Sequence, residues 1–569
     1  MAETTLRVGA GLQTAARESA VGRIAPAVML AVFAMIVALL ETAHTPPFRD
    51  PMEMGYVDFT RRMAAGEGMS TRLLAPYYPP KMPSPISFWP PLYPGAAAIV
   101  TKVGVPAPEA TKLVSIGAFG LTVALIWGLG SAIFDRGVGT VAALLLAVWP
   151  PVARTAGMAL SENLFVLWVV LCAVITIRLL RPQPTTIRVL QIAALGGLAM
   201  GAASLTRYAS LALVPIGALG LLANLQGRTA KERLTIAAIW SVCATVPPVA
   251  FLVRNVVLTG ALIGAGRPPD ERGLFYHLAY AVKTVAADGL ALLSRMLVLP
   301  ELIGMNRRVV ILVALAAAGA LIYGVIRSDR VRAGARTALA GAVGTAERRF
   351  VLMLWAGFWA GMLIAHLTMG FMSLSTRMMM PGYPLALLSL SGVVGLFVSV
   401  VVSRAPRLLP WVIGGLCIAV VAGVVLPRAM AAGGPRLHPD APPVWVKWVA
   451  ANTPPGSPIV GNGGFDYTFY LDRPVVSFAS FLEYRGGDRF DRDCRRIAST
   501  LTTLGWEHPY LILRAEDGGL DPHAMGRRYG RTIERLLLGE PTLPVRVVAT
   551  FPEFIAYQVT SNAWNCGQE

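Results

Sequence analysis

The chain contains repeated apolar runs that approach or exceed the roughly 20 residues needed to cross the hydrocarbon core of a bilayer. Hydrophobic residues make up 55% of its 569 residues and charged residues only 14%. A soluble globular protein carries about 25% charged residues, so this chain is short of polar surface. The sequence therefore predicts an α-helical polytopic membrane protein with about 11–13 spans.

Short loops separate the predicted spans, and the basic residues gather in every second loop. By the positive-inside rule, this alternation places the N-terminus in the cytoplasm and the C-terminus outside. The basic residues behind the net charge of +18 are thus explained as residues that orient the helices in the membrane. We therefore expect no nucleic-acid partner. The spans are predicted near residues 24–43 (an uncleaved anchor), 111–134, 137–157, 161–180, 189–206, 207–225, 234–257, 308–327, 350–371, 380–403 and 409–427, with 92–105 as either a half-inserted helix or a twelfth span.

Three regions fall outside the membrane by this topology. The first loop covers about 44–110, and the middle loop, about 258–307, is predicted to form an amphipathic interfacial helix. In the tail, short apolar runs at 458–461, 474–478, 510–513 and 545–550 alternate with helical patterns, which is typical of a small α/β domain. We therefore expect a membrane-embedded module over 1–427 and an extracytoplasmic α/β domain over 428–569.

Five cysteines divide between these two parts. Cys172, Cys243 and Cys417 lie in apolar runs and are expected to be small packing residues. Cys494 and Cys566 lie in the tail, where they form either one disulfide or two free thiols.

Carboxylates at the outer boundary are the first candidates for chemistry. Asp50 and Glu53 are three residues apart, so a short helix would place them on one face, where either can serve as a general base. Asp50-Pro51 also fits a helix N-cap followed by proline, and Asp58 is expected to be solvated. Glu162 begins a predicted span, where it either faces a substrate or complements the helix dipole.

Cationic residues at the same boundary are candidates for binding phosphate, because guanidinium binds phosphate oxygens bidentately. The alternative for each is contact with lipid headgroups or snorkelling along the bilayer. The candidates are Lys81, Arg207, Arg254 and Arg377.

The sequence contains no clear cofactor-binding motif. The chain has no convincing zinc-ligand spacing, no Walker loop, no nucleophile elbow and no dinucleotide fingerprint. We expect no required cofactor and no metal site, with a divalent cation held by Asp50 and Glu162 as the open alternative.

The order of these motifs resembles the C-type glycosyltransferase superfamily, and within it the bacterial branch related to protein mannosyltransferases and the lipid A aminoarabinose transferase. The family often has adjacent Asp-Glu before a Tyr, whereas here Pro51 and Met52 separate the two acids, and we favour Asp50 as the matching residue. The motifs are the acidic first loop Asp50…Glu53…Tyr56…Gly66, Trp89-Pro90-Pro91-Leu92-Tyr93-Pro94, Leu160-Ser161-Glu162-Asn163, Ser204-Leu205-Thr206-Arg207-Tyr208, Arg254-Asn255, Arg377…Pro381…Pro384, Trp445…Trp448 and Tyr470-Leu471-Asp472-Arg473-Pro474.

The resemblance implies an inverting transfer of a sugar from a polyprenyl-phosphate-linked donor to an acceptor hydroxyl on the outer face of the cytoplasmic membrane. The acceptor would be a glycolipid, a glycan or a protein. The implied catalytic residues are Asp50, Glu53 and Glu162, with Lys81, Arg207, Arg254 and Arg377 on the donor phosphate, and Tyr56, Tyr93 and Asn255 on the acceptor or sugar.

A transporter or flippase of a lipid-linked saccharide is the alternative function. Such a protein would place charged residues near the midplane of several helices, whereas here they lie mostly at predicted outer helix ends. A scaffold subunit whose tail binds a partner is a further alternative. If the chain is an enzyme, we expect Asp50, Lys81, Glu162 and Arg377 to line one outward cavity of several hundred Å3.

Overall fold

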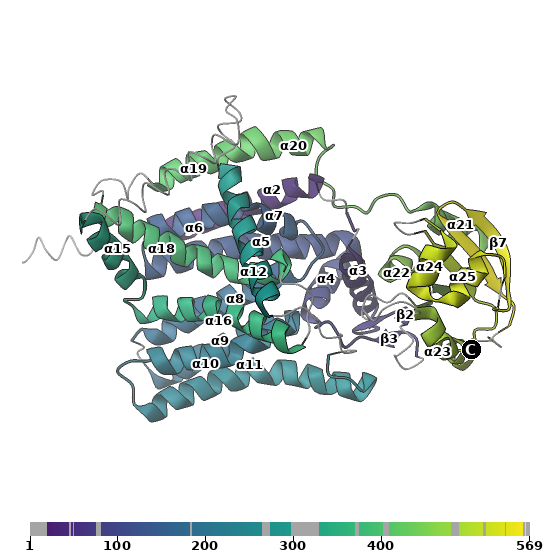
Figure 1. Cartoon of the computed structure of the whole chain (residues 1–569). Coiled ribbons are helices and arrows are strands. Elements are labelled where there is room, and N and C mark those ends of the chain that lie inside the picture. The colour runs from purple at the N-terminus through teal and green to yellow at the C-terminus, as the bar shows by residue number, and fades with distance from the viewer. Residues whose placement is uncertain are drawn as a thin grey trace, which may run out of the picture.

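The computed structural model has two parts, a bundle of long helices and a smaller C-terminal α/β domain at one end of the bundle (Figure 1). The predicted span at 308–327 and Cys566 lie outside the residues that the structure describes. Those residues are 20–44, 47–48, 50–74, 81–182, 185–263, 274–296, 329–369, 375–401, 409–478, 489–515, 519–540, 542–561 and 564.

Within the described residues, eight helices are long and apolar enough to cross a membrane, and a ninth span results if one bent pair is counted together. The chain is thus a multi-pass membrane protein. The bundle helices are α2 (Ala20–Glu41), α5 (Ala107–Ile133), α6 (Arg136–Val148), α7 (Pro150–Ala156), α8 (Glu162–Thr176), α9 (Thr186–Thr206), α10 (Leu213–Asn224), α11 (Ala230–Thr259), α15 (Asp329–Ala342), α16 (Ala346–Met369), α18 (Tyr383–Val401), α19 (Leu409–Val420) and α20 (Leu426–Ala431).

The predicted span 137–157 is broken into α6 and α7, which meet at an angle of 65°. Trp149 stands at the break with extended backbone angles (φ −69°, ψ 113°). Pro150 follows it, and a residue before proline is driven out of the helical region by contact with the proline ring. The break is therefore encoded locally by the sequence.

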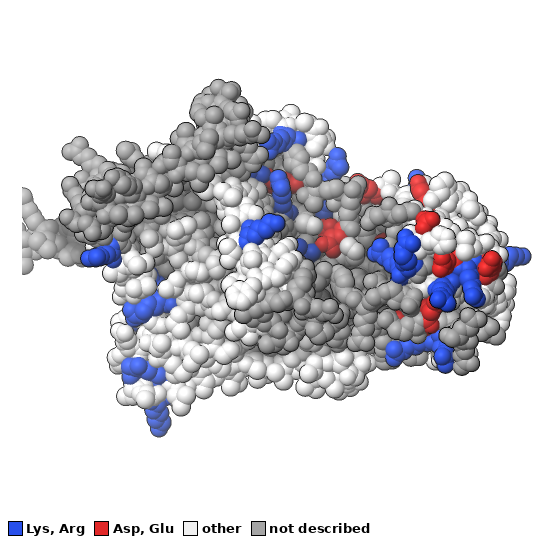
Figure 2. Space-filling model, viewed as in Figure 1, with Lys and Arg blue, Asp and Glu red and all other residues white. Residues whose placement is uncertain are grey.

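The loops that we predict on one side of the membrane do lie together at one end of the bundle. Arg181 donates to the carbonyl of Ala132 at 2.7 Å, and Arg348 donates to the carbonyl of Ile133 at 2.8 Å. Arg349 donates to Asn224 Oδ1 at 2.8 Å, so loops distant in sequence meet. At this end, which is far from the C-terminal domain, the described side chains that Figure 2 colours on the face in view are basic and not acidic.

The first loop folds at the opposite end of the bundle, between the bundle and the C-terminal domain (Figure 1). It contains α3 (Pro51–Ala64), β1 (Ser70–Thr71), β2 (Leu73–Leu74), β3 (Ser84–Pro85) and α4 (Leu92–Lys102). The 11-residue α4 is too short to cross a bilayer, and it packs against α3 and α5. Residues 92–105 are therefore not a twelfth span.

The middle loop contains α12 (Leu274–Met296), which crosses the long helices at a steep angle in Figure 1. Polar contacts fix α12 to the bundle. Arg295 donates to Glu41 Oε1 at 2.6 Å, and the Trp149 indole donates to the carbonyl of Asp288 at 2.7 Å. The predicted helix is thus present. Hydrogen bonds of buried polar residues fix it to the bundle, in addition to its amphipathic character.

The C-terminal domain has a six-stranded sheet in the order β2-β5-β4-β6-β8-β7. All four predicted strands are present, as β4 (Ile459–Gly461), β5 (Val475–Ser477), β6 (Tyr510–Arg514) and β7 (Val545–Phe551), and β8 (Phe554–Val559) forms an unpredicted hairpin with β7. Cys494 is disulfide-bonded, and Cys172, Cys243 and Cys417 are free. The helices are α21 (Val444–Asn452), α22 (Phe465–Leu471), α23 (Arg489–Thr503), α24 (Pro522–Tyr529) and α25 (Arg531–Leu537).

The first loop supplies the edge strand β2 of this sheet, which pairs in parallel with β5 through Leu73 and Val475. Beside this pair, Arg62 binds Asp472 at 2.5 Å. Trp89 of the loop stacks on Phe465 of α22 with ring centroids 5.6 Å apart. These contacts attach the C-terminal domain to the loop that carries Asp50.

Gly55→Ala is expected to weaken this attachment. A Cβ atom on Gly55 would lie 2.7 Å from Trp89 and 3.0 Å from Phe465, so a larger side chain must separate α3 from the aromatic contact. Overpacking of this kind costs about 1–3 kcal/mol. Limited proteolysis and thermal unfolding of the purified chain measure the loss. Gly128→Ala is the matched control, because a Cβ there meets no atom within 4 Å, and equal behaviour of the two variants would contradict the prediction.

Candidate functional site

Asp50 combines the two roles that its sequence context suggests. It is the N-cap of α3, and its Oδ1 accepts a hydrogen bond from the Met52 backbone N–H at 2.8 Å. Its other oxygen, Oδ2, accepts from Arg377 Nη1 at 2.7 Å. Capping fixes the carboxylate in place while leaving one oxygen directed at the bundle, and its side chain stays 26% exposed.

Arg377 connects the first loop to the bundle. It lies on the short helix α17 (Thr376–Met379), and its Nε donates to Glu162 Oε1 at 2.8 Å. The neighbouring Thr376 hydroxyl donates to Asp288 Oδ1 of α12 at 3.0 Å, and the Tyr383 hydroxyl donates to Asp288 Oδ2 at 2.5 Å. The segment that carries Arg377 is therefore held on both sides by the same α12 carboxylate.

Glu162 is fully buried at the start of α8 and is surrounded by two arginines. Its Oε1 accepts from Arg377 and also lies 3.0 Å from Arg207 Nη1. Its Oε2 is buried and has no hydrogen-bond partner among the residues that the structure describes. Buried polar atoms in native proteins nearly always have a partner, so this oxygen is a point at which a bound ligand or water can donate.

Ser161 extends the cluster towards the first loop. Its Oγ lies 2.8 Å from the Tyr56 hydroxyl and accepts from Arg207 Nη1 at 3.2 Å. Burial raises the pKa of Tyr56, which keeps the phenol protonated and able to donate. We call Asp50, Tyr56, Glu162, Arg207 and Arg377 the carboxylate–arginine cluster.

The cluster balances two carboxylates with two guanidinium groups. The side chains of Arg207 and Arg377 are each 26% exposed, so both keep an accessible edge. Guanidinium presents five N–H donors in a planar fork, and the protein contacts of each arginine leave donors for an incoming anion. The site can therefore bind a phosphate beside a partly exposed carboxylate.

Glu53 faces inward from the same helix and is only 1% exposed. Its Oε1 accepts from the Ala159 backbone N–H at 2.8 Å. Burial outweighs that hydrogen bond and raises the pKa of Glu53 to about 7. Asp58, which we predict to be solvated, is in fact fully buried, where it accepts from the Thr71 hydroxyl and burial raises its pKa to about 6.

Four other predicted site residues do not join the cluster. Arg254 donates to the carbonyls of Ile86 at 2.7 Å and Met69 at 3.0 Å. The buried Asn255 amide donates to the Tyr208 hydroxyl at 3.0 Å and to the carbonyl of Ser87 at 3.2 Å. Both residues thus hold the backbone of the first loop, which favours a structural role.

The other two predicted site residues, Lys81 and Tyr93, differ in how far solvent reaches their side chains. Tyr93 is fully buried and donates to the carbonyl of Thr111 at 2.8 Å, while Lys81 is exposed. Substrate contacts by Lys81, Tyr93, Arg254 and Asn255 therefore stay predictions.

A cavity of about 610 Å3 lies beside the cluster, between the first loop and the C-terminal domain. The sequence predicts that Asp50, Lys81, Glu162 and Arg377 line one outward cavity. This cavity does not meet that prediction, because its lining includes none of the four. The loop side is lined by Pro47, Phe48, Pro51 and Met54, and the domain side by Asp440, Ala441, Pro443, Asn462, Gly463, Gly464, Asp466, Tyr470 and Arg514.

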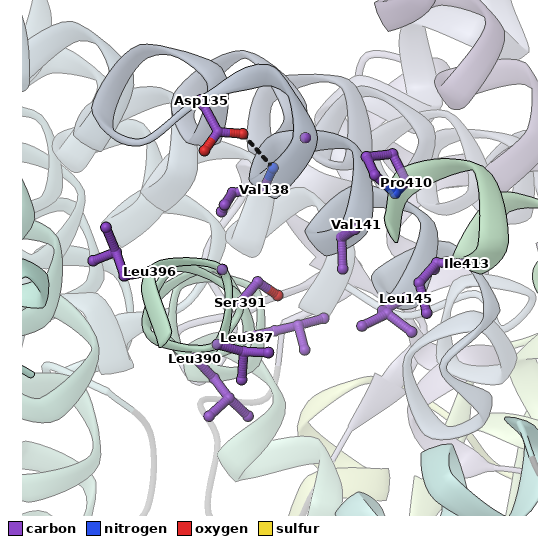
Figure 3. Close-up of a pocket in the computed structure, with 13 residues that line it drawn as sticks. Asp135, Val138, Val141, Leu145, Leu387, Leu390, Ser391, Leu396, Pro410 and Ile413 are labelled. Atoms are coloured by element: carbon purple, nitrogen blue, oxygen red, sulfur yellow. Dashed lines mark hydrogen bonds between the residues drawn. The ribbon is translucent and has the colours of Figure 1, made fainter. Parts of the chain in front are cut away.

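A second pocket, of about 250 Å3, lies between α6, α18 and α19 (Figure 3). Its walls are mostly aliphatic, and its carboxylate, Asp135, caps α6 by accepting from the Val138 backbone N–H at 2.9 Å. This pocket therefore offers mainly hydrocarbon contact.

Metal ligation has no support from geometry in the part of the chain that the structure describes. No three His, Cys, Asp or Glu side chains cluster there as metal ligands. Asp50 and Glu162, the pair considered for a divalent cation, each bind Arg377.

No protein-family model and no curated protein matches the chain. Solved structures do match. ArnT from Cupriavidus metallidurans bound to undecaprenyl phosphate has a TM-score of 0.55 at 13% identity, over 97% of this chain and 100% of that chain. The Archaeoglobus fulgidus oligosaccharyltransferase in complex with zinc and sulfate has a TM-score of 0.51 at 13% identity. The match covers 93% of this chain and 72% of that chain.

A further match is the oligosaccharyltransferase AglB from Archaeoglobus fulgidus in complex with an inhibitory peptide and a dolichol-phosphate. Its TM-score is 0.50 at 12% identity, and the match covers 93% of this chain and 74% of that chain. At such identities the likeness is one of fold. It confirms the resemblance that the sequence motifs indicate, because the chain has the fold of the C-type glycosyltransferases.

Glu53→Gln is expected to change how stability depends on pH. The pKa of Glu53 rises from 4.5 to about 7 on folding, so between these values the unfolded chain releases a proton that the folded chain keeps. The free energy of unfolding therefore falls as pH rises from 4.5 to about 7 and levels off above it. Glutamine does not titrate, so this contribution disappears in the variant.

Thermal unfolding of both purified proteins between about pH 5 and pH 8 measures the difference. Glu507→Gln, at an exposed position, is the control and should follow the wild type. Parallel curves for the wild type and Glu53→Gln would contradict the assignment.

Proposed function

We propose that this protein is a membrane glycosyltransferase that moves a sugar from a polyprenyl-phosphate-linked donor to an acceptor hydroxyl. The observation that carries the proposal is the carboxylate–arginine cluster, in which a partly exposed carboxylate stands beside two partly exposed guanidinium groups. Undecaprenyl phosphate and dolichol-phosphate are bound in two structures of the same fold. We extend this class of lipid phosphate to the present chain.

Asp50 is the proposed general base. Of the three candidate carboxylates, Glu162 is fully buried and Glu53 is 1% exposed, whereas the side chain of Asp50 is 26% exposed. A base must approach the proton it removes to hydrogen-bond distance, so exposure favours Asp50. The order of accessibility thus supports the choice that the sequence motif suggests.

Arg377 and Arg207 are the proposed ligands of the donor phosphate, and Glu162 is the positioning residue that orients both. A phosphate that binds Arg377 would compete with its bond to Asp50 and so release the carboxylate for proton transfer. This exchange would couple donor binding to activation of the base.

The proposed reaction is a single displacement. The acceptor oxygen bonds to the anomeric carbon as the bond from that carbon to the phosphate oxygen breaks, which inverts the configuration, and Asp50 takes the hydroxyl proton. Polyprenyl phosphate leaves as an anion, so no acid is needed to protonate it, and the arginines stabilise the charge that develops.

We place the reaction on the outer face of the cytoplasmic membrane, with the N-terminus in the cytoplasm. The arginine-rich loops lie together at the end of the bundle opposite the cluster, which supports this orientation by the positive-inside rule. The C-terminal domain would then be periplasmic or extracellular.

A transporter of the lipid-linked saccharide is the alternative. Among the described residues, the charged members of the cluster lie at helix ends, since Glu162 begins α8, Asp50 caps α3 and Arg207 caps the C-terminus of α9. A transporter would need such groups near the membrane midplane. Their position therefore favours chemistry at the membrane surface.

Asp50→Asn is expected to lower sugar transfer by about 10²–10⁴-fold, the usual contribution of a general base. Asparagine is as good an N-cap as aspartate, so α3 should remain intact and the loss should report the charge alone. The measurement is sugar transfer by membranes with a panel of radiolabelled polyprenyl-phosphate sugars. Asp135→Asn, which changes another capping aspartate at the far end of the bundle, is the matched control.

The outcomes separate the alternatives. Transfer by the wild type that Asp50→Asn retains at equal expression would shift the base to another carboxylate. Movement of the labelled saccharide across vesicles without transfer from any donor would favour the transporter.

Arg377→Lys is expected to raise the KM for the donor by about tenfold, because lysine keeps the charge and loses the planar fork that binds phosphate bidentately. Initial rates at varied donor concentration measure this change. An unaltered donor KM would remove Arg377 from the phosphate site.

A further inference from the structure

The cavity between the first loop and the C-terminal domain is lined by no member of the carboxylate–arginine cluster. The loop wall is apolar and contains Phe48 and Pro51, which flank Asp50 in the sequence. The domain wall carries Asp440, Asp466 and Arg514. A ligand in this cavity would thus lie against the chain segment that presents the proposed base.

The charge in the cavity disfavours anions. Its lining contains two carboxylates, Asp440 and Asp466, and one guanidinium, Arg514. Arg514 is already paired with Asp466, and its guanidinium lies 5.0 Å from the ring centroids of Trp445 and Tyr467. Among the described lining residues, carboxylates outnumber guanidinium groups by one, while Lys112 lies behind the loop wall with its Nζ 4.5 Å from the Phe48 ring centroid. An incoming phosphate or carboxylate would meet the Asp440 carboxylate on the domain wall.

The polar wall is fixed before any ligand binds. The Asn462 amide donates to the carbonyl of Arg514 at 2.9 Å and accepts from its backbone N–H at 2.8 Å. A Cβ atom on Gly463 would overlap the Tyr467 ring and lie 2.8 Å from Arg514 Nη2, so glycine leaves room for both side chains there. Such preorganisation lowers the cost of ordering side chains on binding.

The remaining surface suits the two kinds of group that a sugar presents. Carboxylates and guanidinium exchange hydrogen bonds with hydroxyl groups. The half-buried Tyr470, together with Phe48 and Met54, offers apolar surface to the C–H faces of a sugar ring. The volume of about 610 Å3 is within the usual range of ligand pockets.

We infer that this cavity binds the acceptor and that the acceptor is a neutral saccharide, with Tyr470 as its aromatic platform and Asp440 as the residue that excludes anionic acceptors. The inference rests on the proposed function, because it names the acceptor of that reaction. An anionic glycolipid, such as one bearing phosphate groups, is the class that the charge disfavours.

The test measures binding without a donor, so that it does not depend on sugar transfer. Saturation-transfer difference NMR on the purified full chain would compare neutral tetrasaccharides of mannose, glucose, galactose and arabinose with tetrasaccharides of galacturonic acid. We expect at least one neutral tetrasaccharide to bind and the galacturonic acid series to bind about tenfold more weakly or not at all.

Variants assign that binding to the cavity. Tyr470→Ala should weaken it about tenfold, whereas Tyr470→Phe, which keeps the ring, should retain it. Asp440→Asn should reduce the preference for neutral over galacturonic acid saccharides, and folding should not be affected because Asp440 is exposed. Glu507→Gln, an exposed acid outside the cavity, is the charge-matched control.

Three results would overturn the inference: no neutral saccharide binds, galacturonic acid saccharides bind as tightly as neutral ones, or Tyr470→Ala and Asp440→Asn behave as the wild type. Failure of the proposed function looks different. In that case neutral saccharides would still bind, with the expected effects of the variants, while no donor supports transfer.

Discussion

The bridge that Arg377 makes between Asp50 and Glu162 is the interaction on which the arrangement of the site depends. It joins the first loop, the start of α8 and the segment before α18, which are far apart in the sequence. Glu162 is fully buried, and a buried charge persists only when it is paired and hydrogen-bonded. Its two arginines meet that requirement, and Asp288 in turn fixes the segment that carries Arg377 through Thr376 and Tyr383.

The first loop transmits this arrangement to the C-terminal domain. Its helix α3 carries Asp50 at one end, and its strand β2 extends the C-terminal sheet. The aromatic contact of Trp89 with Phe465 closes the interface between the two parts. The proposed base and the cavity beside it are therefore positioned by one continuous segment, which explains why this loop contains several buried polar groups.

Local patterns predicted much of the fold. The apolar runs, the strands β4 to β7, the helical patterns between β5 and β7, and the capping role of Asp50 all follow from periodicity and from the preference of aspartate before proline. Burial of polar residues was harder to predict. Asp58 is buried and not solvated. Arg254 and Asn255 donate to backbone carbonyls of the first loop, because a carbonyl satisfies a guanidinium or amide donor as well as a ligand does.

The sequence by itself determined that the chain crosses a membrane many times, which end carries the arginine-rich loops, and which carboxylates and arginines lie near the other end. These properties depend on residues close together in the chain. Only the tertiary structure decided that Asp50, Glu162, Arg207 and Arg377 meet, that β2 joins a sheet formed by residues about 400 positions later, and that Tyr470 faces a cavity beside Asp50. These contacts join distant segments, and their formation depends on packing and charge pairing that no local pattern encodes.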